Sequence, residues 1–290
     1  MFKYMFFDDN GYNLDAVFHD YTWMSYPVEF NDPFDAQVFV SFDKLRNDIY
    51  RHKAGELIDT LRSGGVNFSA EAIEELAQAE DFIADFAFEV FRRQHGEKAR
   101  ELACAIDNAV ARLLTDLGAS FRDQFQRGYL VGSFSRRVDS ILMWSHYSQK
   151  HSGFCIEYPF GDLPLFDVRV RLLEPVIYRD SLFDATEYYR PMLLGETEFN
   201  NLFGLYVTMM KAEAWSYEEE WRIISPIGAG ADEYRKLTMP NPKALYLGAR
   251  ISPPNQDIIV SFAKARNIPV YRMQLSDTRY GLEVAGFNAT

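Results

Sequence analysis

The 290-residue sequence contains only two cysteines, Cys104 and Cys155, and they do not form closely spaced pairs. A structural zinc site needs three or four ligands, so these cysteines predict neither a metal centre nor a disulfide framework. No run approaches the roughly 20 apolar residues that span a bilayer. The opening segment also lacks the basic start and apolar stretch of a secretory signal. We therefore expect a cytoplasmic protein that does not enter a membrane.

Basic residues are in the minority, with 30 Lys and Arg against 42 Asp and Glu and a net charge of −12. Proteins that coat nucleic acid neutralise phosphates over a broad surface, so this balance argues against that class and leaves only a local basic groove open. Apolar material is plentiful, because 48% of the residues are hydrophobic and 16% are aromatic. This composition excludes an intrinsically disordered chain and predicts an aromatic-rich core.

The pattern along the chain changes twice, since helical periodicity over 43–127 is flanked by segments typical of strands and turns. Ser69 is a suitable N-cap for a helix whose apolar face continues to Phe91. A further helix is expected from Ala99 and should end at Gly118. We interpret 43–127 as a helical insertion.

The flanking segments predict strands separated by short helices. The order after the insertion is a strand, a short helix and a strand, over 129–135, 140–149 and 153–158. Other strands are expected at 3–6, 21–24, 169–178, 221–225, 244–247 and 270–275, with helices near 198–213 and 255–266. The fold class is therefore α+β, with a mixed sheet in a single domain over 1–290.

The first cluster of polar residues is Phe30-Asn31-Asp32-Pro33-Phe34-Asp35, in which two carboxylates and an amide lie in a turn between aromatics. Such groups suit a binding site. Asn and Asp also hydrogen-bond their own backbone in turns, which explains the same residues structurally.

The second cluster follows the expected strand that carries Ser133 and Ser135. On a helix, the spacing of Ser140, Trp144, Tyr147 and His151 would place all four on one stripe. An aromatic stripe is usually core packing. The hydroxyls and imidazole around this one keep a ligand-binding interpretation open.

The third cluster runs from Lys211 to Arg222 and contains three successive glutamates. Alternation along the expected strand puts Glu218, Glu220 and Arg222 on one face. The Glu220 side chain would then project from this face of the sheet, beside the Arg222 guanidinium, which would hold the carboxylate ionised. The structural alternative is an ion pair of Glu220 with Arg222 or Lys211 that only closes the sheet.

These clusters carry a resemblance to a known family. The motifs FNDPFD, MWSHY with the following HSGF, and YEEEWR, together with Lys3-Tyr4, resemble those of a widespread bacterial family of unknown function over nearly the whole chain. More distantly, the order of a polar first-strand residue, a Ser-x-Ser strand and a Glu-x-Glu segment is similar to that of ADP-ribosyltransferases. Neither a Walker-type or GxGxxG loop nor a GxSxG elbow occurs.

The similarity to ADP-ribosyltransferases implies a related fold and a cleft that binds NAD as a substrate. It implies that Glu220 is the catalytic glutamate, that Glu218 orients or deprotonates the acceptor, and that Tyr147 stacks on nicotinamide. Breaking the N-glycosidic bond builds an oxocarbenium-like cation, which a fixed carboxylate stabilises. The candidate NAD-binding residues are Lys3, Tyr4, Asn31, Asp32, Ser133, Ser135, Trp144, His151 and Arg222.

The expected function is therefore NAD-dependent modification of a protein or nucleic acid, an activity that fits a toxin or an anti-phage effector. Two alternatives remain open. Asp32, Asp35, Glu218 and Glu220 would suit a divalent ion in a metal-dependent nuclease or phosphodiesterase. A non-enzymatic module would instead use the aromatic stripe to bind a peptide or nucleotide.

Overall fold

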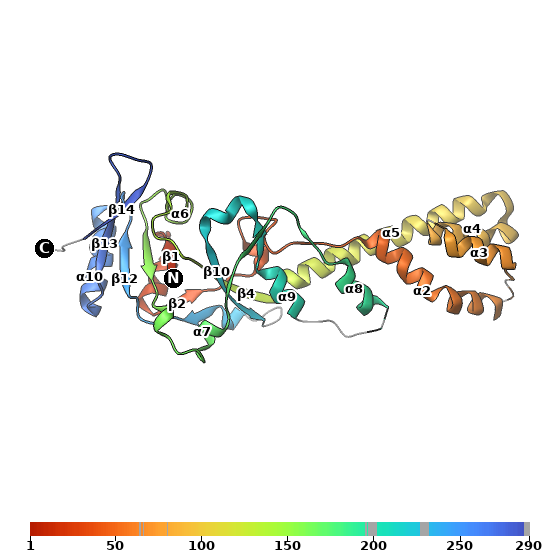
Figure 1. Cartoon of the computed structure of the whole chain (residues 1–290), viewed down its shortest axis with the longest axis horizontal. Helices are drawn as coiled ribbons and strands as arrows, with labels where there is room; N and C mark the ends of the chain where they lie inside the picture. The colour runs from red at the N-terminus through yellow and green to blue at the C-terminus, as the bar shows by residue number, and fades with distance from the viewer. Residues whose placement is uncertain are drawn as a thin grey trace. The chain divides into compact units, whose positions relative to one another are not determined.

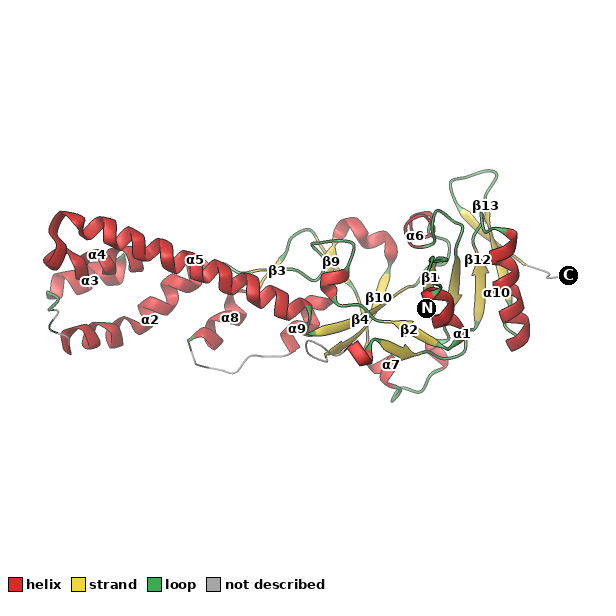
Figure 2. Ribbon diagram, turned by 180° about the vertical axis from the view of Figure 1, so that it is seen from behind, coloured by secondary structure: helices red, strands yellow, loops and turns green. Residues whose placement is uncertain are grey.

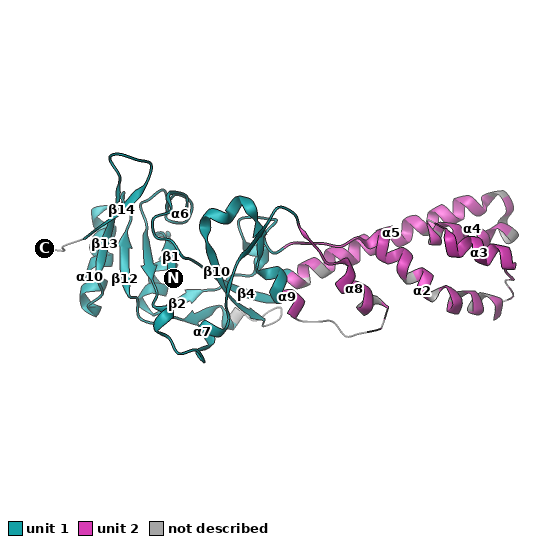
Figure 3. Ribbon diagram, in the orientation of Figure 1, with its two compact units in different colours: residues 1–36, 126–181, 205–290 teal, residues 37–125, 182–204 magenta. Residues whose placement is uncertain are grey.

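The computed structural model describes residues 1–63, 65, 67–79, 81–194, 196, 202–226 and 232–286. The chain falls into two compact units (Figure 3). Unit 1 comprises residues 1–36, 126–181 and 205–290, and unit 2 comprises residues 37–125 and 182–204. Unit 1 contains the large sheet and the candidate site, whereas unit 2 is mainly helical.

An eight-stranded mixed sheet organises unit 1 (Figure 1). Its strands, in spatial order, are β14 (Leu282–Gly286), β13 (Val270–Leu275), β12 (Ala244–Leu247), β5 (Phe154–Glu157), β1 (Phe2–Met5), β4 (Tyr129–Ser135), β10 (Glu220–Pro226) and β6 (Leu173–Pro175). Only the β12–β13 pair is parallel. The predicted α+β class with a mixed sheet is confirmed.

Smaller elements surround this sheet. Two strand pairs join β2 (Tyr21–Trp23) to β11 (Lys236–Thr238) and β7 (Ile177–Arg179) to β9 (Met210–Ala212). The α-helices are α1 (Tyr12–Phe18), α6 (Ile141–Tyr147), α7 (Val168–Arg171), α9 (Leu202–Thr208), which begins in unit 2, and α10 (Pro253–Arg266). The 3₁₀ turns are η1 (Pro27–Glu29), η3 (Phe160–Asp162), η4 (Glu213–Glu218) and η5 (Asp232–Tyr234).

Unit 2 is built from helices and one short strand pair. Its elements are β3 (Val38–Phe39), α2 (Phe42–Ser63), α3 (Ala70–Gln78), α4 (Phe82–His95), η2 (Gly96–Lys98), α5 (Ala99–Gln126), β8 (Phe183–Asp184) and α8 (Thr186–Leu193). Among the described residues, no helix in either unit is both long and apolar enough to span a membrane.

Two helix predictions in this region were wrong at their ends. Ser69 caps its helix as expected, but the helix stops at Gln78, and the Asp81 carboxylate accepts a hydrogen bond from the Ala84 N–H to begin α4. Helix α5 does not end at Gly118. The position is buried, and a Cβ there would collide with the Phe42 ring, so this glycine lets α5 pack closely against the start of α2.

The strand predicted over 169–178 was also wrong in part. The Asp167 carboxylate accepts a hydrogen bond from the Arg169 N–H, and this starts the helical turn α7. Of the two short strands that follow, β6 pairs with β10 and β7 pairs with β9. Of the helix predicted near 198–213, residues 198–201 lie outside the described residues, and α9 covers 202–208.

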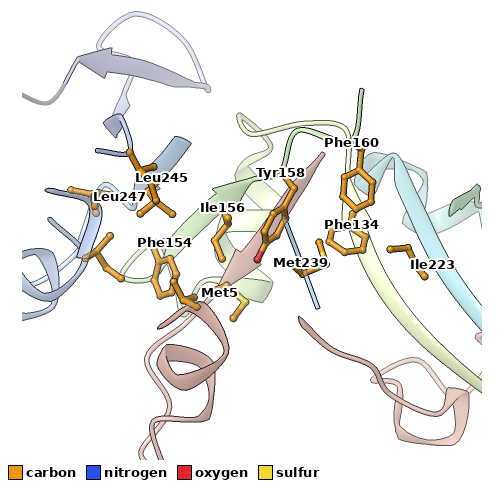
Figure 4. Packing of buried hydrophobic residues seen from close by; sticks show 14 of the residues in the cluster. Met5, Phe134, Phe154, Ile156, Tyr158, Phe160, Ile223, Met239, Leu245 and Leu247 are labelled. Carbon is orange, nitrogen blue, oxygen red and sulfur yellow. The ribbon is translucent and has the colours of Figure 1, made fainter. Parts of the chain in front are cut away.

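The alternation of strand residues divides the interior of unit 1 between the two faces of the sheet. Met5, Phe134, Ile156 and Leu245 pack in one cluster, part of which Figure 4 shows. Helix α10 adds Ile259 and Ala263 to it and lies beside β12 and β13 (Figure 2). The other face buries a second cluster that contains Tyr4, Trp144, Cys155, Tyr246 and Met273.

The sheet opens between β1 and β4. Their register contains a single pair, Phe2 opposite Ser135. Farther along β4, Val131 forms two backbone hydrogen bonds with Ser25, each of 2.9 Å, in place of bonds to β1. The two strands therefore separate on the side of the Phe2–Ser135 pair that leads back to Val131. Side chains from both strands can line the space between them.

Candidate functional site

A cavity of about 720 Å³ lies at this separation and is lined by β1, β4, β10, α6 and the loop that contains Phe30 and Asp35. Its volume is within the range of about 300–1,000 Å³ that is typical of small-molecule sites. Nine of the twelve predicted site residues line it: Lys3, Tyr4, Asn31, Ser133, Ser135, Tyr147, Glu218, Glu220 and Arg222. The three sequence clusters therefore converge on one cleft.

Three predicted site residues, Asp32, Trp144 and His151, do not line the cavity. Asp32 accepts a hydrogen bond from the Phe34 N–H at 2.9 Å, as the turn interpretation expects. Trp144 is fully buried, and its indole N–H donates to the Val138 carbonyl at 2.6 Å.

The predicted stripe that ends at His151 was wrong. Helix α6 ends at Tyr147, and Gln149, Lys150 and His151 all have positive φ angles. The chain therefore turns away, and the His151 ring lies 3.1 Å from the Ser145 hydroxyl instead of beside Tyr147.

The floor of the cavity is a buried network of charges centred on Glu220. Arg222 donates to both oxygens of Glu220, through Nε at 2.9 Å and Nη2 at 3.1 Å. Lys211 donates to Oε2 of the same carboxylate at 2.9 Å. The ion pairs that the structural alternative described are thus present, and they lie against a cavity rather than inside a solid core.

Asp35 extends this network to a distant part of the sequence. Its two carboxylate oxygens accept hydrogen bonds from Arg222 Nη1 at 2.8 Å and Nη2 at 2.7 Å. Arg222 Nη1 also donates to the Thr208 carbonyl at 2.7 Å. Arg222 therefore ties together the Asp35 loop, the end of α9 and β10, and all four of its contacts with carboxylates are buried.

Asp35 and Lys211 were not among the predicted NAD-binding residues, although both line the cavity. The sequence predicted Lys211 as an ion-pair partner of Glu220 or, in the nuclease alternative, as a phosphate contact, and it predicted Asp35 as part of the first polar cluster and as a metal ligand. Charge balance was the available signal, because two glutamates that face a buried site require cations. The pairing of Asp35 with Arg222 joins positions 187 residues apart and has no local signature.

Glu218 lies in η4 and not in the strand, which begins at Glu220. Glu219 adopts the left-handed conformation with φ 42°, and the chain turns there so that Glu218 still faces the site. The Tyr147 hydroxyl donates to Glu218 Oε1 at 2.7 Å, and Lys211 donates to Oε2 at 2.6 Å. The predicted common face is therefore correct for Glu218, although its strand placement was wrong.

The two glutamates differ in their ease of protonation. Burial raises the pKa of Glu218, and the attraction of Lys211 does not fully offset it. Burial also acts to raise the pKa of Glu220, but Arg222 and Lys211 outweigh it and hold that pKa well below its usual range. At neutral pH Glu220 is a fixed anion, while Glu218 is the carboxylate better suited to accept a proton.

Serine and lysine side chains brace the walls. The Ser135 hydroxyl donates to the Glu218 carbonyl at 2.6 Å and accepts from the Arg137 N–H at 3.0 Å, so it holds η4 against β4. The Ser133 side chain also helps to lower the pKa of Glu220. Lys3 Nζ donates to the Ser133 carbonyl at 3.0 Å, across the opening between β1 and β4.

The depressed pKa of Glu220 predicts a pH-dependent stability. The folded state lowers the pKa of Glu220. The contribution of Glu220 to the free energy of unfolding is therefore present above the unfolded pKa of about 4.5, and it is lost as the pH falls from 4.5 towards the folded pKa. We expect Glu220→Gln to be less stable than wild type at neutral pH, with a difference that shrinks by up to about 1.4 kcal/mol per pH unit below 4.5.

Urea unfolding followed by tryptophan fluorescence measures this difference, because all four tryptophans lie in unit 1. Glu219→Gln is the matched control, since Glu219 is exposed and its substitution should leave the wild-type pH profile unchanged. A difference between Glu220→Gln and wild type that stays constant from about pH 7 to about pH 3 would contradict the assignment.

The geometry does not favour the divalent-ion alternative. The carboxylates of Asp35, Glu218 and Glu220 all lie within 3.6 Å of Lys211 Nζ, so an ammonium group occupies the point where they meet. Asp32, the fourth proposed ligand, does not line the cavity. In the part of the chain that the structure describes, no group of three or more His, Cys, Asp or Glu side chains is arranged to hold a metal ion.

Comparison with known families gives a match that covers part of the chain. The model of a family described as a protein of unknown function, DUF2971, matches residues 143–223. The matched segment contains Tyr147, Lys211, Glu218, Glu220 and Arg222. The predicted resemblance to a family of unknown function is confirmed over this segment, whereas its extension to nearly the whole chain and its motifs stay a prediction. No curated protein and no solved structure matches the chain.

Proposed function

We propose that the cleft of unit 1 binds NAD and cleaves its bond to nicotinamide, as an ADP-ribosyltransferase-like enzyme of the cytoplasm that transfers ADP-ribose to a protein or nucleic acid. The observation that carries the proposal is the joint placement of Tyr147, Ser135, Glu218 and Glu220 around one cavity of about 720 Å³. The opening of the sheet between β1 and β4 supports the related fold. Roles as a toxin or an anti-phage effector are compatible with this activity.

Glu218 is the group that we assign to proton transfer. Its pKa is raised by burial, and a base whose pKa lies nearer the operating pH transfers protons more effectively. In the reaction, the C1″–nitrogen bond breaks, nicotinamide leaves, and the acceptor oxygen or nitrogen bonds to C1″ and loses its proton to the Glu218 carboxylate. Tyr147, which donates to Glu218, stands beside this step.

Glu220 takes a different role in this proposal from the one that the family resemblance implies. Arg222 and Lys211 donate to its oxygens and hold its pKa well below its usual range, so it is a poorer proton acceptor than Glu218. We assign it to positioning, because it fixes Lys211, which in turn holds Glu218. The reacting carboxylate and its neighbours are thereby preorganised in a site of low dielectric constant.

Aromatic side chains supply surfaces on which the planar rings of NAD can stack. Trp23 and Phe6 line the cavity and keep 47% and 43% of their surface exposed. Phe30 also lines it, with the Arg222 guanidinium 5.2 Å from its ring centre. Exposed aromatic residues at a cleft bind nucleobases through their faces, which suits a dinucleotide.

Two measurements on the purified full chain test the proposal. Nicotinamide release from NAD should be detectable by chromatography, with label transfer when candidate proteins or nucleic acids are added. NAD at 100 times its dissociation constant should stabilise the chain by about 2.7 kcal/mol in a thermal-shift experiment. The proposal fails if nicotinamide is not released, no label is transferred and NAD leaves the melting temperature unchanged.

A further inference from the structure

Lys3 occupies a position that the reaction above does not use. It lies on β1 at the point where β1 and β4 separate, and it lines the cavity. The side chain is half-buried, and Nζ donates to the Ser133 carbonyl at 3.0 Å. This bond leaves the other sites of the nitrogen available to a ligand in the cleft.

The surroundings of Lys3 differ from those of Lys211, the other lysine of the cavity. Three carboxylates lie within 4.0 Å of Lys211 Nζ, whereas among the described residues no carboxylate lies within 4.0 Å of Lys3 Nζ. Lys3 Nζ instead lies 5.3 Å from the centre of the Phe134 ring. The carboxylate that acts on it from β10 is Glu220, which is already paired with Arg222 and Lys211.

These surroundings disfavour the ammonium form of Lys3. Burial lowers the pKa of Lys3 to about 8, and Glu220 only partly opposes this effect. At pH 7 a larger fraction of Lys3 is therefore neutral than of an ordinary lysine, whose pKa is about 10.4. A neutral lysine amine in a cleft is a nucleophile towards carbonyl groups.

We propose that Lys3 Nζ is a covalent-capture site for aldehydes that enter the cleft, in particular the open-chain form of ADP-ribose. This choice of ligand rests on the proposed function, because hydrolysis of NAD in the cleft would release ADP-ribose beside Lys3. A captured product would occupy the cavity and block the next NAD. The amine would thereby make the enzyme sensitive to accumulation of its own product.

The chemistry needs no further reactant. The lone pair of Nζ forms a bond to the aldehyde carbon, and the carbonyl π electrons move to oxygen. A proton passes from nitrogen to that oxygen to give a carbinolamine. Loss of the hydroxyl group with the second nitrogen proton releases one water and leaves a C=N bond, so the imine forms reversibly without oxidation or reduction.

Reductive trapping tests the inference on the full chain. Acetaldehyde with cyanoborohydride at pH 7 converts imines to stable amines, and peptide mass spectrometry gives the rate at each lysine. We expect Lys3 to be modified at least about tenfold faster than the exposed Lys150 and Lys264. Excess ADP-ribose should slow this modification and, with cyanoborohydride, should itself become attached to Lys3.

Lys3→Arg keeps a cation at the opening and removes the nucleophile. In this variant, the peptide that contains residue 3 should lose its attached ADP-ribose, and the remaining attachment should be that of the exposed lysines. Circular dichroism verifies that the variant remains folded. Modification of Lys3 by acetaldehyde no faster than Lys150 would overturn the inference. Protection of Lys3 by neither ADP-ribose nor NAD would overturn the choice of ligand and count against the proposed function as well. Nicotinamide release by a chain whose Lys3 is inert would overturn this inference alone.

Discussion

Replacing Glu218 with glutamine is expected to lower the rate of nicotinamide release by about 10³-fold, within the range of about 10²–10⁴ that a positioned acid–base group contributes. Glutamine keeps the shape of the side chain and can still accept a hydrogen bond from Lys211, but it cannot take the acceptor proton. The measurement is the initial rate of nicotinamide release at saturating NAD, with the dissociation constant of NAD determined in parallel.

The stability of Glu218→Gln should remain close to that of wild type. The folded state raises the pKa of Glu218, so its stabilising contribution is present below the unfolded value of about 4.5 and is lost as the pH rises through the folded value. At neutral pH the ionised carboxylate therefore supplies no stability that glutamine would remove. A loss of activity together with an intact melting temperature separates a chemical role from a structural one.

Glu219→Gln is the matched control, because it makes the same chemical change at the next residue, whose side chain is exposed and lies outside the cavity. It should keep the wild-type rate. A non-enzymatic binding module would show no turnover in any of these proteins. Equal rates for Glu218→Gln and wild type, with NAD turnover present, would show that Glu218 does not take part in the reaction. Glu220 would then be the candidate catalytic carboxylate.

Replacing Arg222 with methionine is expected to lower the free energy of unfolding of unit 1 by about 3–5 kcal/mol, the cost of removing one partner from a buried ion pair. Arg222 is 1% exposed and contacts both Asp35 and Glu220. Without the guanidinium, the charged partner that Asp35 keeps among the described residues is Lys211, whose Nζ is 3.6 Å away. Urea unfolding monitored by tryptophan fluorescence reports this change in unit 1.

A double variant shows whether the loss comes from an uncompensated charge. Asp35→Asn removes the negative charge that Arg222→Met leaves unpaired, so the two substitutions together should cost less than the sum of their separate effects. A coupling energy of about 1–3 kcal/mol is expected for groups in direct contact. Additive effects of the two substitutions would show that the Asp35–Arg222 contact contributes no specific stability.

Local patterns in the sequence were sufficient to predict most strands of unit 1 and several of the side chains that line the cavity. Strict alternation correctly predicted that Glu220 and Arg222 share a face, since successive strand residues point to opposite sides. Ser133 and Ser135, which the family resemblance implied as site residues, both line the cavity. Helical spacing failed for His151, because α6 ends at Tyr147 and the chain then passes through Gln149, Lys150 and His151 with positive φ, although none of them is glycine.

The sequence by itself determined the α+β class, most strands of the sheet, and the residue types that a cleft for a charged, planar ligand would need. Only the tertiary structure decided which of these residues meet. It brought Asp35 to Arg222 across 187 residues and made Lys211 the shared partner of Glu218 and Glu220. The physical reason is that burial and long-range pairing set the charge state of each group, and neither is encoded in the spacing of neighbouring residues.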